Sequence, residues 1–354
     1  MKRILTIIIM ASIGISYCNA SNHVMHPLKQ ISYVKKQIKA KHEPFFTAYQ
    51  ALIHDADSVM QQQSHALADY SVPGYYVKPK EHKANSLALQ DDAYAAYCLA
   101  LSYKLSGKRE YGEKACYFLN AWATINKKYS DSDGPLVMSY SGTGLLIAAE
   151  LMSDSKIWSN EDIDIFKVWI KTVYQKAANS IRERKNNWAD WGRFGSLLCA
   201  SFLNDKNEVA ENVRLFKMDL FHKIAADGSM PEETRREGNG IWYTYFSLSP
   251  MTGACWLVYN LTGENLFTLK HYDTCIKKSL DYLSYYYKHP TEWPWFKNPN
   301  VDGLWPYNLL EAMGYIYNDS SYFEYVKDHR PIIYRVHHFC WTFPTLMPAL
   351  LKFK

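Results

Sequence analysis

The sequence predicts an all-α fold, either an irregular (α/α) toroid, meaning an incomplete barrel of helical hairpins, or an α-solenoid. Apolar residues recur at helical spacing through most of the 354 residues. Few segments alternate with the period of two that a half-buried strand shows, and Asn239-Gly240 leads into an aromatic helical pattern rather than a β-hairpin. No repeat of fixed length is present, which favours the toroid over a regular solenoid.

Helical segments are expected in order along the chain. The first spans 86–105, where Leu89, Ala93 and Tyr97 recur at helical spacing and Ser106-Gly107 supplies a stop signal. Loops rich in Pro, Gly and aromatic residues, a type that often carries function on a rigid scaffold, are expected at 70–79, 289–297 and 336–343. The later helices are expected at 111–122, 144–152, 160–174 with Asn160 as its N-cap, 170–184, 188–203, 208–224, 242–261, 268–287, 304–317 and 343–352.

The N-terminus predicts export. Met1-Lys-Arg3 is a charged n-region, 4–15 is an apolar run too short to span a bilayer, and Cys18-Asn-Ala20 resembles a cleavage site. We expect residues 1–20 to be a signal peptide that is removed after Ala20. Residues 21–354 are then expected to form a single domain that is periplasmic or secreted. No later apolar run reaches membrane-spanning length, so no integral membrane span is expected.

Composition narrows the class of partner. The chain has 28 Tyr, 11 Trp and 15 Phe, and such rings often line carbohydrate clefts, although packing between helices accounts for many of them. The net charge of +5 is mild, and no Lys/Arg cluster indicates nucleic acid. A basic cleft for an anionic polysaccharide is compatible with this balance.

The seven cysteines show no CxxC motif and no Cys/His zinc spacing, so we expect no metal and no cofactor. The thiols at 98, 116, 199 and 255 lie in apolar helical patterns, which favours buried free thiols over a disulfide framework, although export would permit a bridge. Cys18 belongs to the predicted signal peptide. Its lipidation is the alternative to cleavage after Ala20, and Tyr17 directly before it disfavours lipidation.

One segment combines groups that suit an acidic sugar. Arg236 precedes Tyr243 by seven residues, and on a helix residues seven apart lie on one face, two turns apart. The Arg can hold a uronate carboxylate, and the Tyr can take and give a proton beside it. Asn187 can supply an amide to the same carboxylate. The alternative interpretation is a surface Arg beside an aromatic core stripe.

Five segments form a combination of motifs: Asp227-Gly-Ser-Met-Pro-Glu-Glu-Thr-Arg-Arg, Tyr243-Thr-Tyr-Phe-Ser-Leu-Ser-Pro250, Asn186-Asn187, Leu105-Ser-Gly-Lys-Arg-Glu-Tyr111 and Leu119-Asn-Ala-Trp-Ala123. This combination resembles the alginate lyase superfamily, with features of polysaccharide lyase family 5, from about residue 72 to 250. The resemblance implies an (α/α) toroid and β-elimination of a uronate polysaccharide. In such enzymes an Asn and an Arg neutralise the uronate carboxylate, and a Tyr protonates the leaving glycosidic oxygen.

Position 188 departs from the family pattern. Family members carry a His after the paired Asn, where it acts as the base, whereas this chain has Trp188. In this respect it is similar to polysaccharide lyase family 38, in which a Tyr serves as both base and acid. H5 and O4 lie on the same face of β-mannuronate and β-glucuronate, so one Tyr can reach both, but guluronate needs two groups. The resemblance therefore implies that Tyr243 acts alone on alginate, polymannuronate or glucuronan.

The charge that develops on the carboxylate during elimination guides the remaining assignments. Arg235 is the alternative to Arg236 as the carboxylate clamp, and Glu233 either shares a proton with the carboxylate or is a solvated structural residue. An Arg near Tyr243 is expected to lower its pKa from near 10, so that it acts as a base near neutral pH. Substrate contacts are expected from Asn186, Trp188, Trp191, Arg235, Glu233, Tyr245, His337 and His338. Candidates for an alternative base are His82, His222, His289, His337 and His338.

Two other classes of function remain open. A helical-toroid glycoside hydrolase would use paired carboxylates, but a neutral substrate gives no reason for an Arg, Asn and Tyr set. A non-catalytic periplasmic glycan-binding protein would account for the missing His. An unsaturated uronate product distinguishes a lyase from both. The carboxylates available to a hydrolase are Asp190, Glu232, Glu233 and Glu237.

Overall fold

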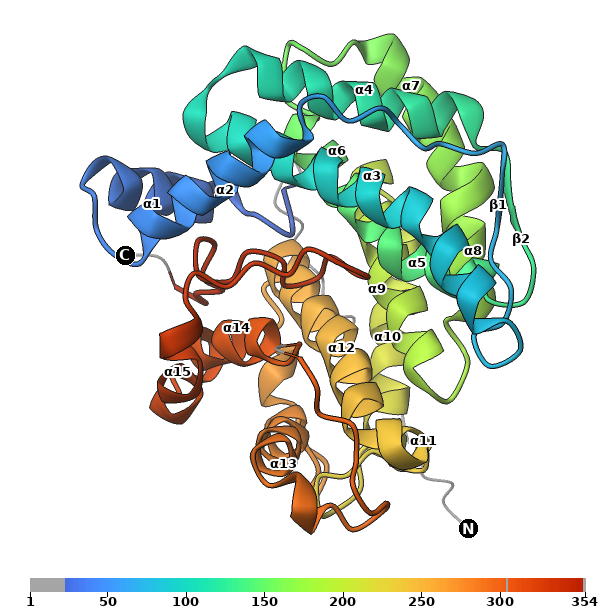
Figure 1. The fold of residues 1–354 in the computed structure, drawn as a ribbon, viewed down its shortest axis with the longest axis vertical. Helices are drawn as coiled ribbons and strands as arrows, with labels where there is room; N and C mark the ends of the chain where they lie inside the picture. Colours follow the sequence, from blue (N-terminus) through green and yellow to red (C-terminus); the bar gives the residue numbers. More distant parts are fainter. Residues whose placement is uncertain (1–22, 304, 353–354) are drawn as a thin grey trace, which may run out of the picture.

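The regular secondary structure is almost entirely helical in the computed structural model, which describes residues 23–303 and 305–352 (Figure 1). The prediction of an all-α chain is confirmed. The named strands in the described part are β1 (Asp69–Ser71) and β2 (Lys128–Ser130), which pair in parallel. The predicted signal peptide and Cys18 lie outside the described residues. The single domain expected over 21–354 stays a prediction.

The helices of the first half pack around α3, which contacts α2, α4 and α6. Gly107, with a φ of +78°, ends α3 in a left-handed conformation that glycine adopts without strain. The elements of this half are α1 (Leu28–Lys39), α2 (Phe45–Val59), α3 (Pro79–Ser106), α4 (Arg109–Ile125), α5 (Gly134–Ser141), α6 (Thr143–Met152), α7 (Asn160–Trp169), a π-helical turn (Ile170–Tyr174) and α8 (Gln175–Ile181).

Helix α9 joins the two halves, because it contacts α5 and α8 of the first half as well as α10 and α12 of the second. Helix α12 crosses the centre of the molecule, and the segment after α15 passes between α2 and α14 (Figure 1). The elements of this half are α9 (Asn187–Leu203), α10 (Lys206–Lys223), α11 (Pro231–Thr234), α12 (Gly240–Thr262), α13 (Ile276–Lys288), α14 (Tyr307–Tyr317) and α15 (Ser320–Val326), with short 3-10 turns between several of them.

Three expectations about helix bounds are wrong. The N-cap of α7 is Ser159 rather than Asn160, because the Ser159 hydroxyl accepts the backbone N–H of Asp162. The helix expected over 268–287 begins only at Ile276, after a turn closed by an isolated bridge. The segment 343–352 is not helical, because Pro344 and Pro348 lie inside it and each removes a backbone donor.

A core of buried apolar side chains extends from Val24 to Ala349. The cysteines of the described residues are free, and all of them except Cys275 are buried, as expected of packing thiols. The stretch Gly134–Met152, which covers α5 and α6, is long and apolar enough to cross a membrane, but almost all of it is buried in the fold. Its composition is therefore accounted for by core packing.

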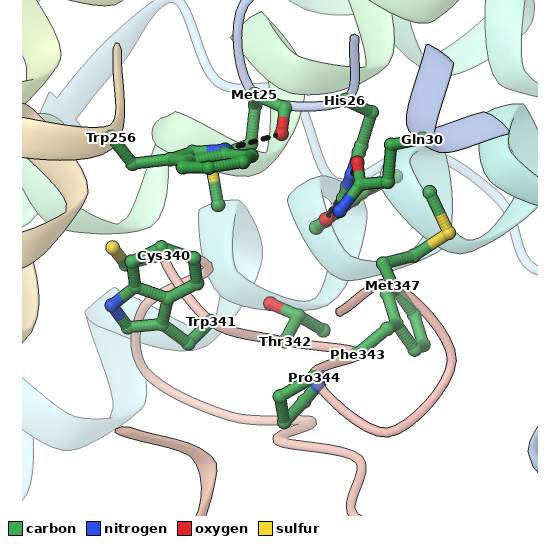
Figure 2. A pocket seen from close by; sticks show the side chains of 11 residues that line it. Met25, His26, Gln30, Trp256, Cys340, Trp341, Thr342, Phe343, Pro344 and Met347 are labelled. Carbon is green, nitrogen blue, oxygen red and sulfur yellow. Dashed lines mark hydrogen bonds between the residues drawn. The ribbon is translucent and has the colours of Figure 1, made fainter. Parts of the chain in front are cut away.

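The two ends of the described chain meet over α12 (Figure 2). The Trp256 indole of α12 donates to the carbonyl oxygen of Met25 at 2.9 Å, and the Gln30 amide donates to the carbonyl oxygen of Pro348 at 3.0 Å. His26 bonds Gln30 at 2.9 Å, and burial lowers the pKa of His26 to about 4. A neutral imidazole therefore holds the N-terminal segment in place at neutral pH.

Candidate active site

A cleft with a volume of about 1120 Å³ opens where the N-terminal ends of α3, α5, α9 and α12 meet. Helix N-termini present unpaired N–H groups and the positive end of the helix dipole, so this placement favours an anionic ligand. Asn187, Arg236 and Tyr243 all line the cleft, as do Asn186 and Trp188. The structure thus brings together the three residues predicted to carry catalysis.

Asn187, the first residue of α9, is fixed by Glu233. One carboxylate oxygen of Glu233 accepts the backbone N–H of Asn187 at 2.6 Å, and the other accepts its side-chain Nδ2 at 2.8 Å. The amide carries two hydrogens, so one N–H remains for a ligand. Glu233 is buried, so its interpretation as a solvated residue is wrong, and its contact with Asn187 makes it a positioning residue.

Burial raises the pKa of Glu233 to about 7, against the opposing effect of the hydrogen bond from Asn187. Only the ionised carboxylate accepts both N–H groups of Asn187, so we expect turnover to fall as the pH drops through about 7. The Glu233→Gln variant should lose this acid limb and keep a low turnover. A pH–rate profile of kcat for both proteins, with folding checked by circular dichroism, tests this. A wild-type profile that stays flat across this range would contradict it.

Buried charged groups hold the first turn of α9 in place through hydrogen bonds. The ammonium group of Lys223 lies 2.7 Å from Asp190 Oδ1 and donates to the carbonyl oxygen of Asn186 at 3.1 Å. Ser247 of α12 donates to the other oxygen of Asp190. Asn186 caps α9, because its side chain accepts the backbone N–H of Trp188. Sequence reasoning missed Lys223, since the partner of a buried lysine on another helix leaves no local signal.

Arg236 reaches the cleft from a turn and not from a helix face. It precedes a 3-10 turn (Glu237–Asn239), and α12 begins at Gly240, so the expectation that Arg236 and Tyr243 share one helix is wrong. A Cβ at Gly240 would lie 2.7 Å from the carbonyl oxygen of Thr234, so only glycine lets α12 start this close to the turn. The Arg236 guanidinium nevertheless lies 5.1 Å from the centroid of the Tyr243 ring.

The Arg236 guanidinium has no carboxylate partner among the described residues, and its Nε is buried without a hydrogen bond. Arg235 differs in both respects, because it is exposed and its guanidinium is bound to Glu232. The structure therefore favours Arg236 over Arg235 as the group that holds an anion in the cleft.

Tyr243 meets a second tyrosine from the loop before α3. Its hydroxyl lies 2.7 Å from the hydroxyl of Tyr76, an exposed residue that sequence reasoning placed in a functional loop but did not single out. Burial, together with this hydrogen bond, raises the pKa of Tyr243 above its ordinary value, and the charge of Arg236 opposes that rise only in part. The expectation of a lowered pKa is therefore wrong, and Tyr243 is a neutral phenol at rest.

Trp188 forms a wall of the cleft, with the guanidinium of Arg184 stacked 3.8 Å from its ring centroid. Lys80 and Lys83, from the first two turns of α3, also line the cleft. These cations were missed because Arg184 lies about a hundred residues from the two lysines, so the three form no cluster in the sequence. With Arg236 they outnumber the carboxylates of the lining, Asp133 and Asp302, so the lining carries a net positive charge that suits a polyanion.

The structure separates the histidine pair. His337 lines the cleft, stacks on Tyr140 at 4.4 Å and has a φ of +73°, an uncommon conformation for a residue with a side chain. Burial lowers the pKa of His337 to about 3, so it is neutral. His338 is fully buried, and its Nε2 lies 3.1 Å from the Tyr245 hydroxyl.

Of the other candidate histidines, one lines the cleft and the others do not. His82 lines the cleft and donates from Nδ1 to the carbonyl oxygen of Pro73 at 2.8 Å. His289 is exposed on the surface after α13, near Glu292. His222 is exposed in the last turn of α10. No group of three His, Cys, Asp or Glu side chains that could hold a metal gathers anywhere in residues 23–303 and 305–352.

Three predicted substrate contacts lie in the core instead. Trp191 is fully buried and packs between Tyr140 and Phe246. Tyr245 is also fully buried, and its hydroxyl bonds Asn308, because two residues of helix turn it away from Tyr243. The prediction of substrate contact is therefore wrong for Trp191, Tyr245 and His338.

Comparisons with known proteins place this geometry in a family. A model of the family described as alginate lyase matches residues 28–293. No curated protein matches the chain. An alginate lyase from Bacteroides ovatus is 21% identical with a TM-score of 0.73, over 88% of this chain and 96% of that chain. Alginate lyase A1-III from Sphingomonas species A1 is 13% identical with a TM-score of 0.73, over 94% of this chain and 97% of that chain.

A further similar structure is a tyrosine-to-phenylalanine variant of alginate lyase A1-III complexed with a tetrasaccharide. It is 13% identical with a TM-score of 0.70, over 86% of this chain and 91% of that chain. At these identities the likeness concerns the fold. It confirms the predicted (α/α) toroid.

Proposed function

Because this chain belongs to the alginate lyase family and is a polysaccharide lyase, we propose that it cleaves a uronic-acid polysaccharide by β-elimination. Arg236 and Asn187 neutralise the carboxylate of the uronate, and Tyr243 moves the proton. The observation that carries this proposal is the unpaired guanidinium of Arg236, which lies beside the Tyr243 phenol in a cleft lined by further cations. An unpaired cation at such a place is suited to a carboxylate.

Removal of H5 is the difficult step, because it places a second negative charge on the carboxylate group of the uronate. Arg236 supplies a permanent charge at that carboxylate, and the remaining N–H of Asn187 supplies a hydrogen bond. Both groups are held before substrate arrives, Asn187 by Glu233 and Arg236 by the turn ahead of α12. Preorganised donors of this kind stabilise the transition state without reorganisation.

The raised pKa of Tyr243 favours one form of the proton transfer. As the C5–H bond breaks, H5 passes to the phenol oxygen, and the proton that this oxygen carried passes to O4. The C4–O4 bond breaks, the C4–C5 double bond forms, and Tyr243 ends as it began, a neutral phenol. This exchange needs H5 and O4 on one face of the sugar, within reach of one oxygen.

Substrate stereochemistry tests this scheme. Since Trp188 replaces the family His, we expect faster initial rates on polymannuronate and glucuronan, in which H5 and O4 are syn, than on polyguluronate of matched length. Rates are followed by the ultraviolet absorbance of the unsaturated uronate, with glycosaminoglycans included in the panel. A clear preference for polyguluronate would instead place a second proton-transfer group, His82 or His337, across the cleft.

The glycoside hydrolase alternative finds little support in the site. Asp190 is held by Lys223, and Glu233 is held by Asn187, so neither is free to serve as an acid or a nucleophile. Glu232 is bound to Arg235. The carboxylates that do line the cleft, Asp133 and Asp302, belong to no predicted pair.

We further propose that the enzyme acts in the periplasm or outside the cell, on the strength of the signal peptide predicted for residues 1–20. N-terminal sequencing of the protein exported from an expressing bacterium should start after Ala20. Recovery of an unprocessed chain in the cytoplasm would contradict this localisation.

A further inference from the structure

A second chamber adjoins the cleft. Its volume is about 580 Å³, and it shares Trp242, Trp305, Val336 and His337 with the cleft as a common wall. Beyond that wall the chamber is formed by the start of α14 and by the segment 329–335. The chamber therefore lies directly beside the cleft that holds Tyr243.

Asn308, in the wall of this chamber, carries a hydrogen-bond donor that has no partner. It is 1% exposed and lines the chamber, and its Nδ2 has no hydrogen-bond partner. The orientation of the amide is fixed, because Oδ1 accepts the backbone N–H of Leu309 at 2.8 Å and the hydroxyl of Tyr245 at 3.1 Å. A backbone N–H can only donate, so the atom facing it must be the oxygen. A buried donor without a partner is costly unless something that enters the chamber satisfies it.

The walls of the chamber suit a sugar ring. Trp305 is partly exposed between cleft and chamber, and its indole is oriented by a 2.9 Å hydrogen bond to the carbonyl oxygen of Asp302. Tyr334 lines the chamber and stacks on His338 at 4.6 Å, so its ring is also held. Rigid aromatic faces pack against the C–H faces of a sugar, and a partly exposed ring retains surface for that contact.

A cation lies at the edge of the chamber. Arg335 is half-exposed and holds Asp55 of α2 through Nε at 2.8 Å and Nη2 at 3.2 Å. This pairing uses one edge of the guanidinium and leaves Nη1 outside the pair. Arg335 and Asn308 thus give the wall of the chamber two donors that an anionic sugar can use.

We propose that this chamber binds a uronate unit of the substrate chain, away from the unit that reacts with Tyr243. The inference rests on the proposed function and adds a determinant of chain length. Asn308 Nδ2 donates to the bound sugar, Trp305 and Tyr334 pack against its ring, and the edge of Arg335 faces its carboxylate. Long chains gain this binding energy, whereas chains too short to pass Trp305 do not.

The test compares kcat/KM on uronate oligosaccharides of increasing length, prepared from the polymer that the wild type cleaves fastest. Ile333→Trp fills the chamber from a residue that lines only this chamber. Asn308→Asp keeps the acceptor for Leu309 and replaces the donor with an oxygen of the same size. Ile165→Trp, on the exposed side of α7, is the matched control. Folding of each variant is checked by thermal unfolding.

In the wild type and in Ile165→Trp we expect kcat/KM to rise once chains are long enough to enter the chamber. Both chamber variants should lower kcat/KM on long chains by about tenfold, Asn308→Asp through the loss of one hydrogen bond to the sugar and Ile333→Trp by filling the chamber. Both should keep the wild-type rate on the shortest cleaved chain. Identical length profiles in folded Ile333→Trp and the wild type would overturn the inference and leave the lyase assignment intact. A wild type that cleaves no uronate polymer would refute the proposed function, and this inference with it.

Discussion

Tyr243→Phe is expected to lower turnover by more than about a thousandfold, because general acid and base contributions are each worth roughly 10²–10⁴. The substitution keeps the ring that packs beside Arg236 and removes only the oxygen that carries the proton. Binding of substrate should change little, so the loss should appear in kcat. Initial rates on the preferred uronate polymer, with substrate affinity measured by calorimetry, separate the two effects.

Tyr245→Phe is the matched control, since it removes a hydroxyl from the same helix two residues away. Tyr245 bonds Asn308 and His338 in the core, so its loss should cost stability without a comparable loss of turnover. Near-normal turnover of Tyr243→Phe, or equal losses in both variants, would contradict the assigned role of Tyr243.

Arg236→Ala is expected to lower turnover by about a hundredfold to a thousandfold, the range seen when a donor to a developing negative charge is removed. The effect should fall on kcat and not only on KM, because the charge on the carboxylate grows toward the transition state. Arg236→Lys keeps the charge without the planar fork, so its turnover should lie between that of the wild type and that of Arg236→Ala.

Arg235→Ala provides the comparison within the same turn. Arg235 is exposed and holds Glu232, and exposed pairs contribute little to stability, so we expect turnover close to that of the wild type. If Arg235→Ala proved as damaging as Arg236→Ala, or if Arg236→Ala raised KM alone, the carboxylate clamp would have to be reassigned.

Much of the fold could be predicted from periodicity. The helix expected at 188–203 matches α9, which spans Asn187–Leu203. Its apolar side chains face neighbouring helices on several sides, which explains the apolar pattern of this segment. Periodicity alone failed at 343–352, where Pro344 and Pro348 determine the backbone of an apolar segment. Helices α1 and α2 were missed by the sequence reasoning although both are amphipathic.

The site could be predicted only in part, because its chemistry depends on contacts between distant segments. The spacing of Arg236 and Tyr243 identified the pair, although a turn and not a helix face brings them together. The rise in the pKa of Tyr243 depends on burial and on Tyr76, which lies 167 residues away in the chain. The choice of Arg236 over Arg235 likewise required knowing which of the two arginines forms an ion pair with Glu232.

The mode of bond cleavage tests the central claim most directly. Purified wild-type protein is incubated with the uronate polymer that it cleaves in water enriched in heavy oxygen, and the products are analysed by ultraviolet absorbance and mass spectrometry. β-Elimination at Arg236, Asn187 and Tyr243 predicts products with one unsaturated uronate end and no oxygen from solvent. Saturated sugars at the new non-reducing ends, without the ultraviolet absorbance of an unsaturated uronate, would show hydrolysis and contradict the account.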